Sequence, residues 1–328
     1  MREAIALSMS EDVFRSSNPR VGCVIVDATG VPVGRGWHQG AGTAHAEVHA
    51  LAQAGEHARG ATAVVTLEPC AHTGRTGPCA QALIDAGIAR VVYAVADPTA
   101  QAAGGGQALR DAGVEVVSGV LEEPARHANR AWLHWQQARR PLVTLKCAMS
   151  LDGRVADATG GPTRITGPQA RSWAHGLRAE VDAIVVGTGT VLADDPQLTA
   201  RHDDGSLRAR QPLRVVMGTR AIPDSARILD GSAETVVIAS HDLGELMEVL
   251  SQHDVLHALV EGGPTLEAAL IDAGLADEAA WLVAPVVLGA GPVALPPLAR
   301  QAGLAVRSVT VLGEDVLVEG GLHVHRDR

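Results

Sequence analysis

The sequence predicts an α/β protein built from two domains. Its 328 residues exceed one ordinary core, and a typical domain of about 150 residues suggests two. Short apolar runs alternate with stretches of helical periodicity, which indicates helices packed on largely parallel sheets. A polar, helix-prone stretch over 121–140 ends at Pro141, where a strand pattern restarts. We therefore expect one domain at 1–140 and a second at 141–328.

The first half begins with apolar residues at helical spacing over 2–14. Two apolar runs, 21–26 and 31–37, flank the turn-like segment 27–30 and predict a β-hairpin. The later elements alternate in type, with helices expected at 46–59, 79–86 and 107–112 and strands at 61–67, 91–95 and 114–117. This alternation predicts an α/β sandwich.

The second half also shows short apolar runs typical of an α/β domain. Its strands are expected at 142–145, 183–186, 213–217, 235–239, 258–260 and 281–287. A helix is expected at 266–273, directly after Gly262-Gly263, and the chain should end in a hairpin formed by 308–311 and 316–319.

Composition excludes several classes of function. The net charge of −10, the pI of about 5.7 and the scattered arginines argue against a nucleic-acid or anionic membrane surface. Four cysteines do not make a disulfide framework, and no stretch resembles a signal peptide or a membrane span. We therefore expect a cytoplasmic protein with a small-molecule substrate, without nucleic-acid or membrane partners.

One histidine and two cysteines form a candidate catalytic zinc site. His45-Ala46-Glu47 is followed by Pro69-Cys70 and Pro78-Cys79. One imidazole and two thiolates leave a fourth position for water, which distinguishes a catalytic zinc from a structural one. Predicted helix N-termini at His45 and Cys79 favour the thiolate form. Glu47 is expected to carry protons for a zinc-activated water that attacks an amidine-type ring carbon and releases ammonia.

Two alternatives remain open for these residues. The chain could be a nucleic-acid or nucleoside deaminase with an unrelated tail, although one Phe and one Tyr disfavour stacking on single strands. The zinc could instead be structural, with the second half a nucleotide-sensing or scaffold module. Glu47 argues against a structural zinc, because such a site has no use for a neighbouring carboxylate. Cys23 and Cys147 lie in apolar strands and are expected to be inert.

The loop between the two cysteines indicates the type of deaminase. Eight residues separate Cys70 from Cys79, where the common signature has two. The segment 66–79 (Thr-Leu-Glu-Pro-Cys-Ala-His-Thr-Gly-Arg-Thr-Gly-Pro-Cys), together with 17–26, 36–38, 45–48 and 97–98, resembles the deaminase half of the RibD family of bifunctional riboflavin biosynthesis enzymes. The resemblance implies a cytidine-deaminase-like α/β/α sandwich.

The activity implied by this resemblance is hydrolytic deamination of 2,5-diamino-6-(5-phosphoribosylamino)pyrimidin-4(3H)-one to 5-amino-6-(5-phosphoribosylamino)uracil. His45, Cys70 and Cys79 would hold zinc, and Glu47 would be the acid/base. The implied substrate contacts are Asn18, His38, His72, Arg75 and Asp97. Among these, Asn18 offers both a donor and an acceptor to a pyrimidine edge, and Arg75 can fork onto phosphate.

Motifs of the second half resemble the reductase half of the same family, in the same order. They lie at 145–153, 177–179, 190–196 and 260–266. The resemblance implies a dihydrofolate-reductase-like α/β domain that uses NADPH to reduce the ribosyl group to ribityl, with assembly into a homo-oligomer through this domain. The glycines 262–263 would let a pyrophosphate approach the following helix N-terminus.

The implied NADPH-binding residues are Ala148, Arg164, Thr190, Asp194, Thr219, Gly263, Pro264 and Thr265. The implied substrate-binding residues are Lys146, Arg178, Leu198, Arg201 and Glu261. Lys146 is the only lysine of the chain, which suggests that an ammonium is needed there. Pro162 and Arg164 stand where the family commonly has a serine and a tryptophan, so the alternative is a deaminase with a degenerate reductase domain.

Overall fold

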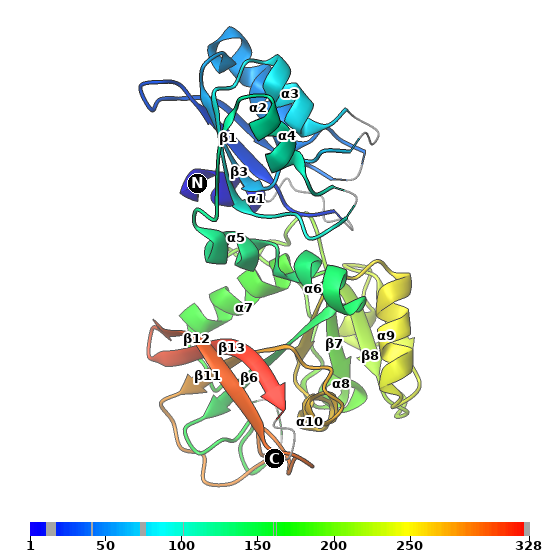
Figure 1. Cartoon of the computed structure of the whole chain (residues 1–328). Helices are drawn as coiled ribbons and strands as arrows, with labels where there is room; N and C mark the ends of the chain where they lie inside the picture. The colour runs from blue at the N-terminus through cyan, green and yellow to red at the C-terminus, as the bar shows by residue number, and fades with distance from the viewer. Residues whose placement is uncertain are drawn as a thin grey trace. The chain divides into compact units, whose positions relative to one another are not determined.

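The computed structural model describes residues 1–10, 18–40, 42–72, 77–100, 102–159, 161 and 163–324. The chain divides into two compact units, Met1–Arg139 and Arg140–Arg328 (Figure 1). Each unit has its own β-sheet and its own apolar core.

Five strands of the first unit form one mixed sheet. They are β1 (Gly22–Val26), β2 (Pro32–Trp37), β3 (Thr62–Leu67), β4 (Arg90–Val95) and β5 (Glu115–Ser118). Their order is β2-β1-β3-β4-β5. β1 runs antiparallel to β2 and β3, whereas β3, β4 and β5 are parallel. The expected hairpin is present, and it makes this sheet mixed rather than largely parallel.

Helices cover both faces of this sheet. They are α1 (Arg2–Ser8), α2 (Ala46–Ala54), α3 (Cys79–Asp85), α4 (Gly105–Asp111), α5 (Glu122–Ala128) and α6 (Arg130–Ala138). α2, α3 and α4 form one layer, while α1 and α5 pack against the other side. Ala46, Ala50 and Ala54 repeat at one face of α2 and are at most 2% exposed, so this helix lies close to the sheet. The α/β/α sandwich is confirmed.

The second unit contains an eight-stranded sheet. Its strands are β6 (Leu142–Ser150), β7 (Ala183–Gly187), β8 (Leu213–Met217), β9 (Thr235–Ile238), β10 (His257–Glu261), β11 (Glu278–Ala284), β12 (Ala302–Leu312) and β13 (Asp315–Val324). Their order is β12-β13-β11-β6-β10-β7-β8-β9. The strands from β11 to β9 in this order are parallel, and only the β12–β13 hairpin joins antiparallel.

Helices α7 (Pro168–Glu180) and α8 (Thr188–Asp194) contribute to one core of this unit, and α9 (Leu243–Gln252) and α10 (Pro264–Asp272) contribute to another. A strand covered on both faces reads as a continuous apolar run. Residues 183–186 of β7 illustrate this, because all four are 0% exposed. The carboxyl ends of β10, β7 and β8 meet at one edge, which positions the loops that follow them.

Most expected elements are found within a few residues of their predicted ends. The helix expected over 46–59 stops earlier, at Ala54, because Gly55 takes a φ of 52° and a 3-10 turn follows. β12 and β13 are longer than expected, and in β12 the many exposed residues conceal the strand pattern. The helices α7, α8 and α9 were not among the expected elements. No helix in the described part of the chain is long and apolar enough to cross a membrane.

Candidate active sites

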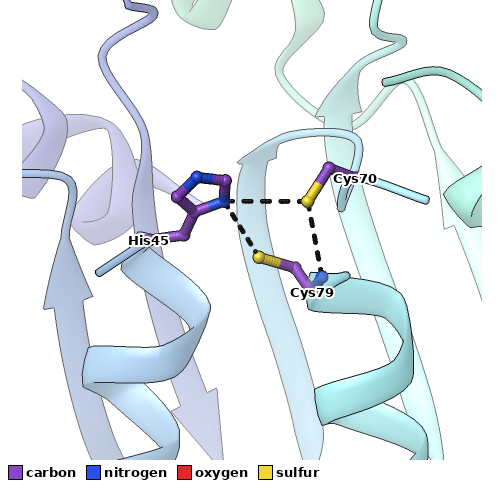
Figure 2. Close-up of side chains that lie close together, drawn as sticks. All are labelled: His45, Cys70 and Cys79. Atoms are coloured by element: carbon purple, nitrogen blue, oxygen red, sulfur yellow. Dashed lines mark hydrogen bonds between the residues drawn. The ribbon is translucent and has the colours of Figure 1, made fainter. Parts of the chain in front are cut away.

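The three predicted zinc ligands come together at the ends of three elements of the first unit (Figure 2). His45 directly precedes α2, Cys70 follows β3, and Cys79 is the first residue of α3. The Nδ1 atom of His45 lies 3.1 Å from Sγ of Cys79 and 3.7 Å from Sγ of Cys70. All three ligand atoms lie within 4.8 Å of one another.

This arrangement fits a zinc ion. Bonds of about 2.0–2.1 Å to nitrogen and 2.3 Å to sulfur place the nitrogen and sulfur of a tetrahedral site roughly 3.6 Å apart. The two nitrogen–sulfur distances, 3.1 and 3.7 Å, are close to this separation. Within the described residues no other group of three such side chains lies close enough to hold a metal. Three protein ligands leave one position for water.

The electrostatics of the site favour an anionic sulfur. Hydrogen bonds from Cys79, including its backbone N–H at 3.4 Å, and from His45 lower the pKa of Cys70 well below its usual range. Glu47, in the first turn of α2, is 3% exposed. Burial raises the pKa of Glu47, which suits a carboxyl group that must both accept and release a proton.

A cavity of about 340 Å³ opens beside these residues. Of the residues assigned to the deaminase by resemblance, those lining this cavity are Asn18, His38, His45, Glu47, Cys70, His72 and Asp97. Arg75 lies outside the described residues. Other residues that line the cavity had no predicted role, among them Glu68, Thr99, Trp132 and Gln136.

His38 is held in one orientation. Its Nδ1 lies 3.3 Å from the carbonyl of Ala44 and must donate to it, so Nε2 accepts from Nδ2 of Asn18 at 3.1 Å. The ring stands edge-on to that of His45, with centroids 5.4 Å apart. Asn18 and His38 are therefore positioned as a pair on the cavity wall.

Two carboxylates, those of Asp97 and Glu68, organise the loop that follows β4. The carboxylate of Asp97 accepts from the backbone N–H and hydroxyl of Thr99, at 2.8 and 2.6 Å, and so shapes its own turn. Glu68 accepts from the backbone N–H groups of Asp97, Gly104 and Gly106. His72 differs from these residues, because its Nδ1 is buried and has no hydrogen-bond partner among the described residues. An unsatisfied ring nitrogen beside a cavity is suited to a ligand.

In the second unit, the predicted glycine turn at 262–263 lies close to Thr190 in the first turn of α8, another predicted NADPH-binding residue. Gly262 and Gly263 have φ values of 79° and 88°, which favour glycine, and Gly263 caps α10. A Cβ on Gly263 would lie 3.5 Å from the hydroxyl of Thr190 and 3.7 Å from the backbone nitrogen of Gly187. Pro264 and Thr265 form the first turn of α10. Small residues and helix N-termini at one sheet edge fit a dinucleotide pyrophosphate.

A buried charge cluster lies at the predicted substrate side of this unit. Arg178 donates from Nε and Nη2 to both carboxylate oxygens of Glu261, at 2.5 and 2.9 Å, and Nζ of Lys146 is 3.8 Å from the same carboxylate. Burial opposes ionisation of Glu261, but Arg178 and Lys146 outweigh it and lower its pKa to about 2. Arg201 lies next to this cluster, because its Nε donates to the hydroxyl of Thr199 at 3.0 Å. Thr199 directly follows Leu198, which is buried.

The remaining predicted cofactor residues are more scattered. Ala148 lies on β6, whereas Asp194, at the end of α8, and Thr219, after β8, are exposed. Arg164 is exposed in the loop before α7, and no described contact joins it to Thr190 or Gly263. Sequence reasoning gave no role to His175, one turn before Arg178 on α7. No sequence pattern marks His175, because its described contact is with the backbone carbonyl of Thr199.

Comparison with known proteins agrees with both halves. Residues 1–95 match the cytidine and deoxycytidylate deaminase zinc-binding region, and residues 141–326 match the RibD C-terminal domain. The riboflavin biosynthesis protein RibD of Mycobacterium tuberculosis is 52% identical over 276 residues, covering 84% of this chain and 80% of that protein. The RibD of Escherichia coli is 42% identical over 338 residues, covering 92% of each chain.

Solved structures agree over the whole chain. Acinetobacter baumannii RibD superposes with a TM-score of 0.83 at 38% identity, covering 99% of this chain and 98% of the other. The diaminohydroxyphosphoribosylaminopyrimidine deaminase/5-amino-6-(5-phosphoribosylamino)uracil reductase of Thermotoga maritima gives 0.87 at 31% identity, covering 99% and 97%. The chain therefore belongs to the RibD family, the two-domain enzymes of riboflavin biosynthesis that join a zinc-binding deaminase to a reductase.

Proposed function

We propose that this chain catalyses two consecutive steps. Residues 1–140 would deaminate 2,5-diamino-6-(5-phosphoribosylamino)pyrimidin-4(3H)-one, and residues 141–328 would reduce the resulting 5-amino-6-(5-phosphoribosylamino)uracil with NADPH. The observation that carries the first step is the convergence of His45, Cys70 and Cys79 beside the buried Glu47, on the wall of a cavity of about 340 Å³.

In the deaminase, Glu47 is the group that moves protons. A bound zinc supplies the Lewis acidity that makes hydroxide available near neutral pH. Glu47 accepts the first proton of the attacking water and passes it to the ring nitrogen. It then takes the remaining proton from the new hydroxyl group and gives it to the amine, which leaves as ammonia. The new C–O bond becomes the uracil carbonyl as the C–N bond breaks. Burial of Glu47 keeps bulk water from competing for these protons.

The cavity wall would hold the substrate. We propose that Asn18 reads the pyrimidine edge, with His38 fixing its orientation, because their side chains are paired at 3.1 Å. His72 offers an unsatisfied ring nitrogen and Asp97 lies on a braced turn, so both suit ribose contacts. Arg75 is proposed for the phosphate on the strength of the sequence motif alone.

Exchange of Glu47 tests the deaminase step. Glu47→Gln should retain one zinc per chain, measured by metal analysis, and lose ammonia release by about 10³-fold or more, since general acid–base catalysis contributes about 10²–10⁴-fold. Cys79→Ala should lose both zinc and activity. The exposed Glu56→Gln serves as the matched control and should change neither. Loss of zinc in Glu47→Gln would favour a structural metal instead.

In the reductase, the bound NADPH would supply the hydride for C1′. We propose that Gly263, Pro264, Thr265 and Thr190 cradle its phosphates, because Gly263 and Thr190 lie close together. Ala148, Arg164, Asp194 and Thr219 are proposed as further cofactor contacts. Glu261 would hold Lys146 and Arg178 in place, and Arg178 and Arg201, beside Leu198, would bind the substrate phosphate.

The alternative of a degenerate reductase rests on Arg164. The apolar core of the second unit and the close approach of Gly263 to Thr190 support an active reductase. NADPH oxidation measured with the deaminated intermediate decides between them. Ammonia release without any NADPH oxidation would leave only the deaminase.

We also propose assembly into a homo-oligomer through the second unit. β12 is an edge strand, and its Val306, Val309 and Val311 are 57%, 63% and 69% exposed. Exposed apolar edge strands favour pairing with another chain. Val309→Lys should shift the species seen by light scattering toward the monomer. The cytoplasm is the proposed compartment, because none of the four cysteines forms a disulfide.

A further inference from the structure

Three side chains of the reductase unit converge on Thr199. The carbonyl of Thr199 accepts from Nη1 of Arg178 at 3.3 Å and faces Nδ1 of His175 at 3.2 Å. Its hydroxyl accepts from Nε of Arg201 at 3.0 Å. Thr199 itself is 1% exposed. His175 therefore belongs to the same cluster as the two arginines proposed to bind the substrate phosphate.

The carbonyl of Thr199 fixes the tautomer of His175. A carbonyl only accepts, so Nδ1 must carry a hydrogen and donate it. In the neutral ring, Nε2 is then the nitrogen without a hydrogen, and the described residues make no hydrogen bond to it. Nε2 can gain a proton without disturbing the bond to Thr199.

The charges around His175 are mostly positive. Arg178 lies on the same helix, Arg201 on the segment after α8, and Glu261 at the end of β10. Lys146 of β6 shares Glu261 with Arg178. Arg201 donates to the neutral oxygens of Thr199, Gly205 and Gln197 in the described part of the chain. One carboxylate thus faces three permanent cations, and the excess positive charge suits an anion.

We propose that His175 is a further substrate-binding residue of the reductase, which takes up a proton when the substrate's phosphate monoester binds beside Arg178 and Arg201 and then donates from Nε2 to that phosphate. This inference rests on the proposed reductase function.

His175 would take up a proton because phosphate binding changes the charges around its ring. In the free protein, burial and the charge of Arg178 lower the pKa of His175 from its ordinary value, although the bond to Thr199 and the charge of Glu261 oppose this, and the shift favours the neutral ring. A bound phosphate dianion offsets the arginine charges and offers an acceptor, and both effects favour the protonated ring. Because binding of the phosphate favours protonated His175, the affinity for the substrate must fall as the pH rises, by up to about tenfold for each pH unit.

The first test compares wild type with His175→Asn in the full chain. Asparagine places its Nδ2 near the position of Nδ1 and can keep the bond to Thr199, but it cannot be protonated. At pH 6.5 the variant should raise the reductase KM for 5-amino-6-(5-phosphoribosylamino)uracil by about tenfold, the size expected for one charge-assisted hydrogen bond. The kcat should change by less than about threefold.

The pH profile separates this role from a structural one. Between pH 6.5 and 9 the wild-type KM should rise toward that of the variant, whose KM stays flat, so the two agree within about twofold at pH 9. A ratio of KM values that stays constant with pH would overturn the inference. His253→Asn is the matched control, because the Nδ1 of His253 also faces a backbone carbonyl, that of Val249 at 2.9 Å. This control should behave as wild type at every pH.

Calorimetry provides a readout that does not depend on turnover. Ribose 5-phosphate is titrated into the full-length protein at pH 7.5 in two buffers of different ionisation enthalpy. Wild type should take up a measurable fraction of one proton, and His175→Asn should take up none. Absence of uptake by wild type would overturn the inference even if the variant fails to fold. Failure of NADPH oxidation with uptake intact would instead reject only the proposed reductase step.

Discussion

Glu68 and Asp97 lie on neighbouring loops of the deaminase unit, and the backbone N–H of Asp97 donates to Oε2 of Glu68 at 3.2 Å. The other oxygen of Glu68 accepts from the N–H groups of Gly104 and Gly106, at 3.3 and 2.9 Å. Glu68 precedes Cys70 by two residues. One carboxylate therefore ties the loop that carries Asp97 to the segment that carries a zinc ligand.

The first prediction concerns this carboxylate. Glu68→Ala leaves three backbone donors without their acceptor, and each hydrogen bond to a charged group contributes about 1.5–3 kcal/mol. The loop over 97–106 should loosen, and the deaminase KM should rise about tenfold or more while zinc content is retained. Glu68→Gln keeps one acceptor oxygen, so its deaminase KM should rise less than that of Glu68→Ala. Steady-state kinetics with metal analysis measures both effects.

The control for Glu68 is Glu115 of β5. This residue is exposed and pairs with Arg90 at 3.1 Å on the surface, where an ion pair contributes about 0–1 kcal/mol. Glu115→Ala should leave the deaminase KM unchanged. An equal rise in both variants would show that the loop effect is not specific to Glu68.

A second prediction concerns Trp132 of α6. Its indole is 6% exposed and lines the deaminase cavity, so we expect it to contact the pyrimidine ring. Aromatic stacking on a base contributes about 1–3 kcal/mol, so Trp132→Leu, which keeps apolar bulk, should raise the deaminase KM about 5- to 100-fold. Reductase activity should not change. Trp135→Leu, on the same helix and outside the cavity lining, is the matched control, and an equal effect there would contradict the prediction.

The sequence predicted the zinc site because its signals are local. His45 and Glu47 are two residues apart, and Cys70 and Cys79 each follow a proline at the predicted end of an element. Trp132 and Gln136 gave no such signal, because only the folded chain brings them to the cavity that residues distant in sequence, such as His45, also line. His175 was missed for a similar reason. Its role depends on Thr199, which belongs to a different segment and contacts it through a backbone carbonyl that no sequence pattern reveals.

A third prediction concerns the stability of the reductase unit at high pH. Glu267 of α10 is 1% exposed, and its Oε2 has no hydrogen-bond partner within the described residues. Burial raises the pKa of Glu267 to about 8, although the backbone N–H of Gly262 and the charge of Lys146 oppose this shift. The folded protein thus holds this proton more tightly than the unfolded chain, whose carboxyl titrates near 4.5. Stability is greatest below that pH and falls as the pH rises toward 8.

The change amounts to about 5 kcal/mol at most between pH 4.5 and 9. Glu267→Gln does not titrate, so its melting temperature relative to wild type should rise by roughly 5–15 °C from pH 5 to pH 9. Differential scanning calorimetry at several pH values measures this difference. The exposed Glu245→Gln of α9 should show no such trend. Parallel pH curves for Glu267→Gln and wild type would mean that Glu267 is already ionised when folded.

The last prediction concerns Gly105, at the start of α4. A Cβ at this position would lie 1.7 Å from the carbonyl oxygen of Pro69, the residue before the zinc ligand Cys70. Gly105→Ala must therefore push α4 away from the loop that carries Cys70. Zinc affinity and ammonia release should both fall about tenfold or more, the range seen when residues that orient metal ligands are changed, and the reductase should keep its activity. Gly77→Ala provides the control, because among the described residues, the chain neighbours of Gly77 aside, no atom lies within 4 Å of a Cβ placed there. Normal zinc affinity in Gly105→Ala would show that the Cys70 loop tolerates displacement and is not held by α4.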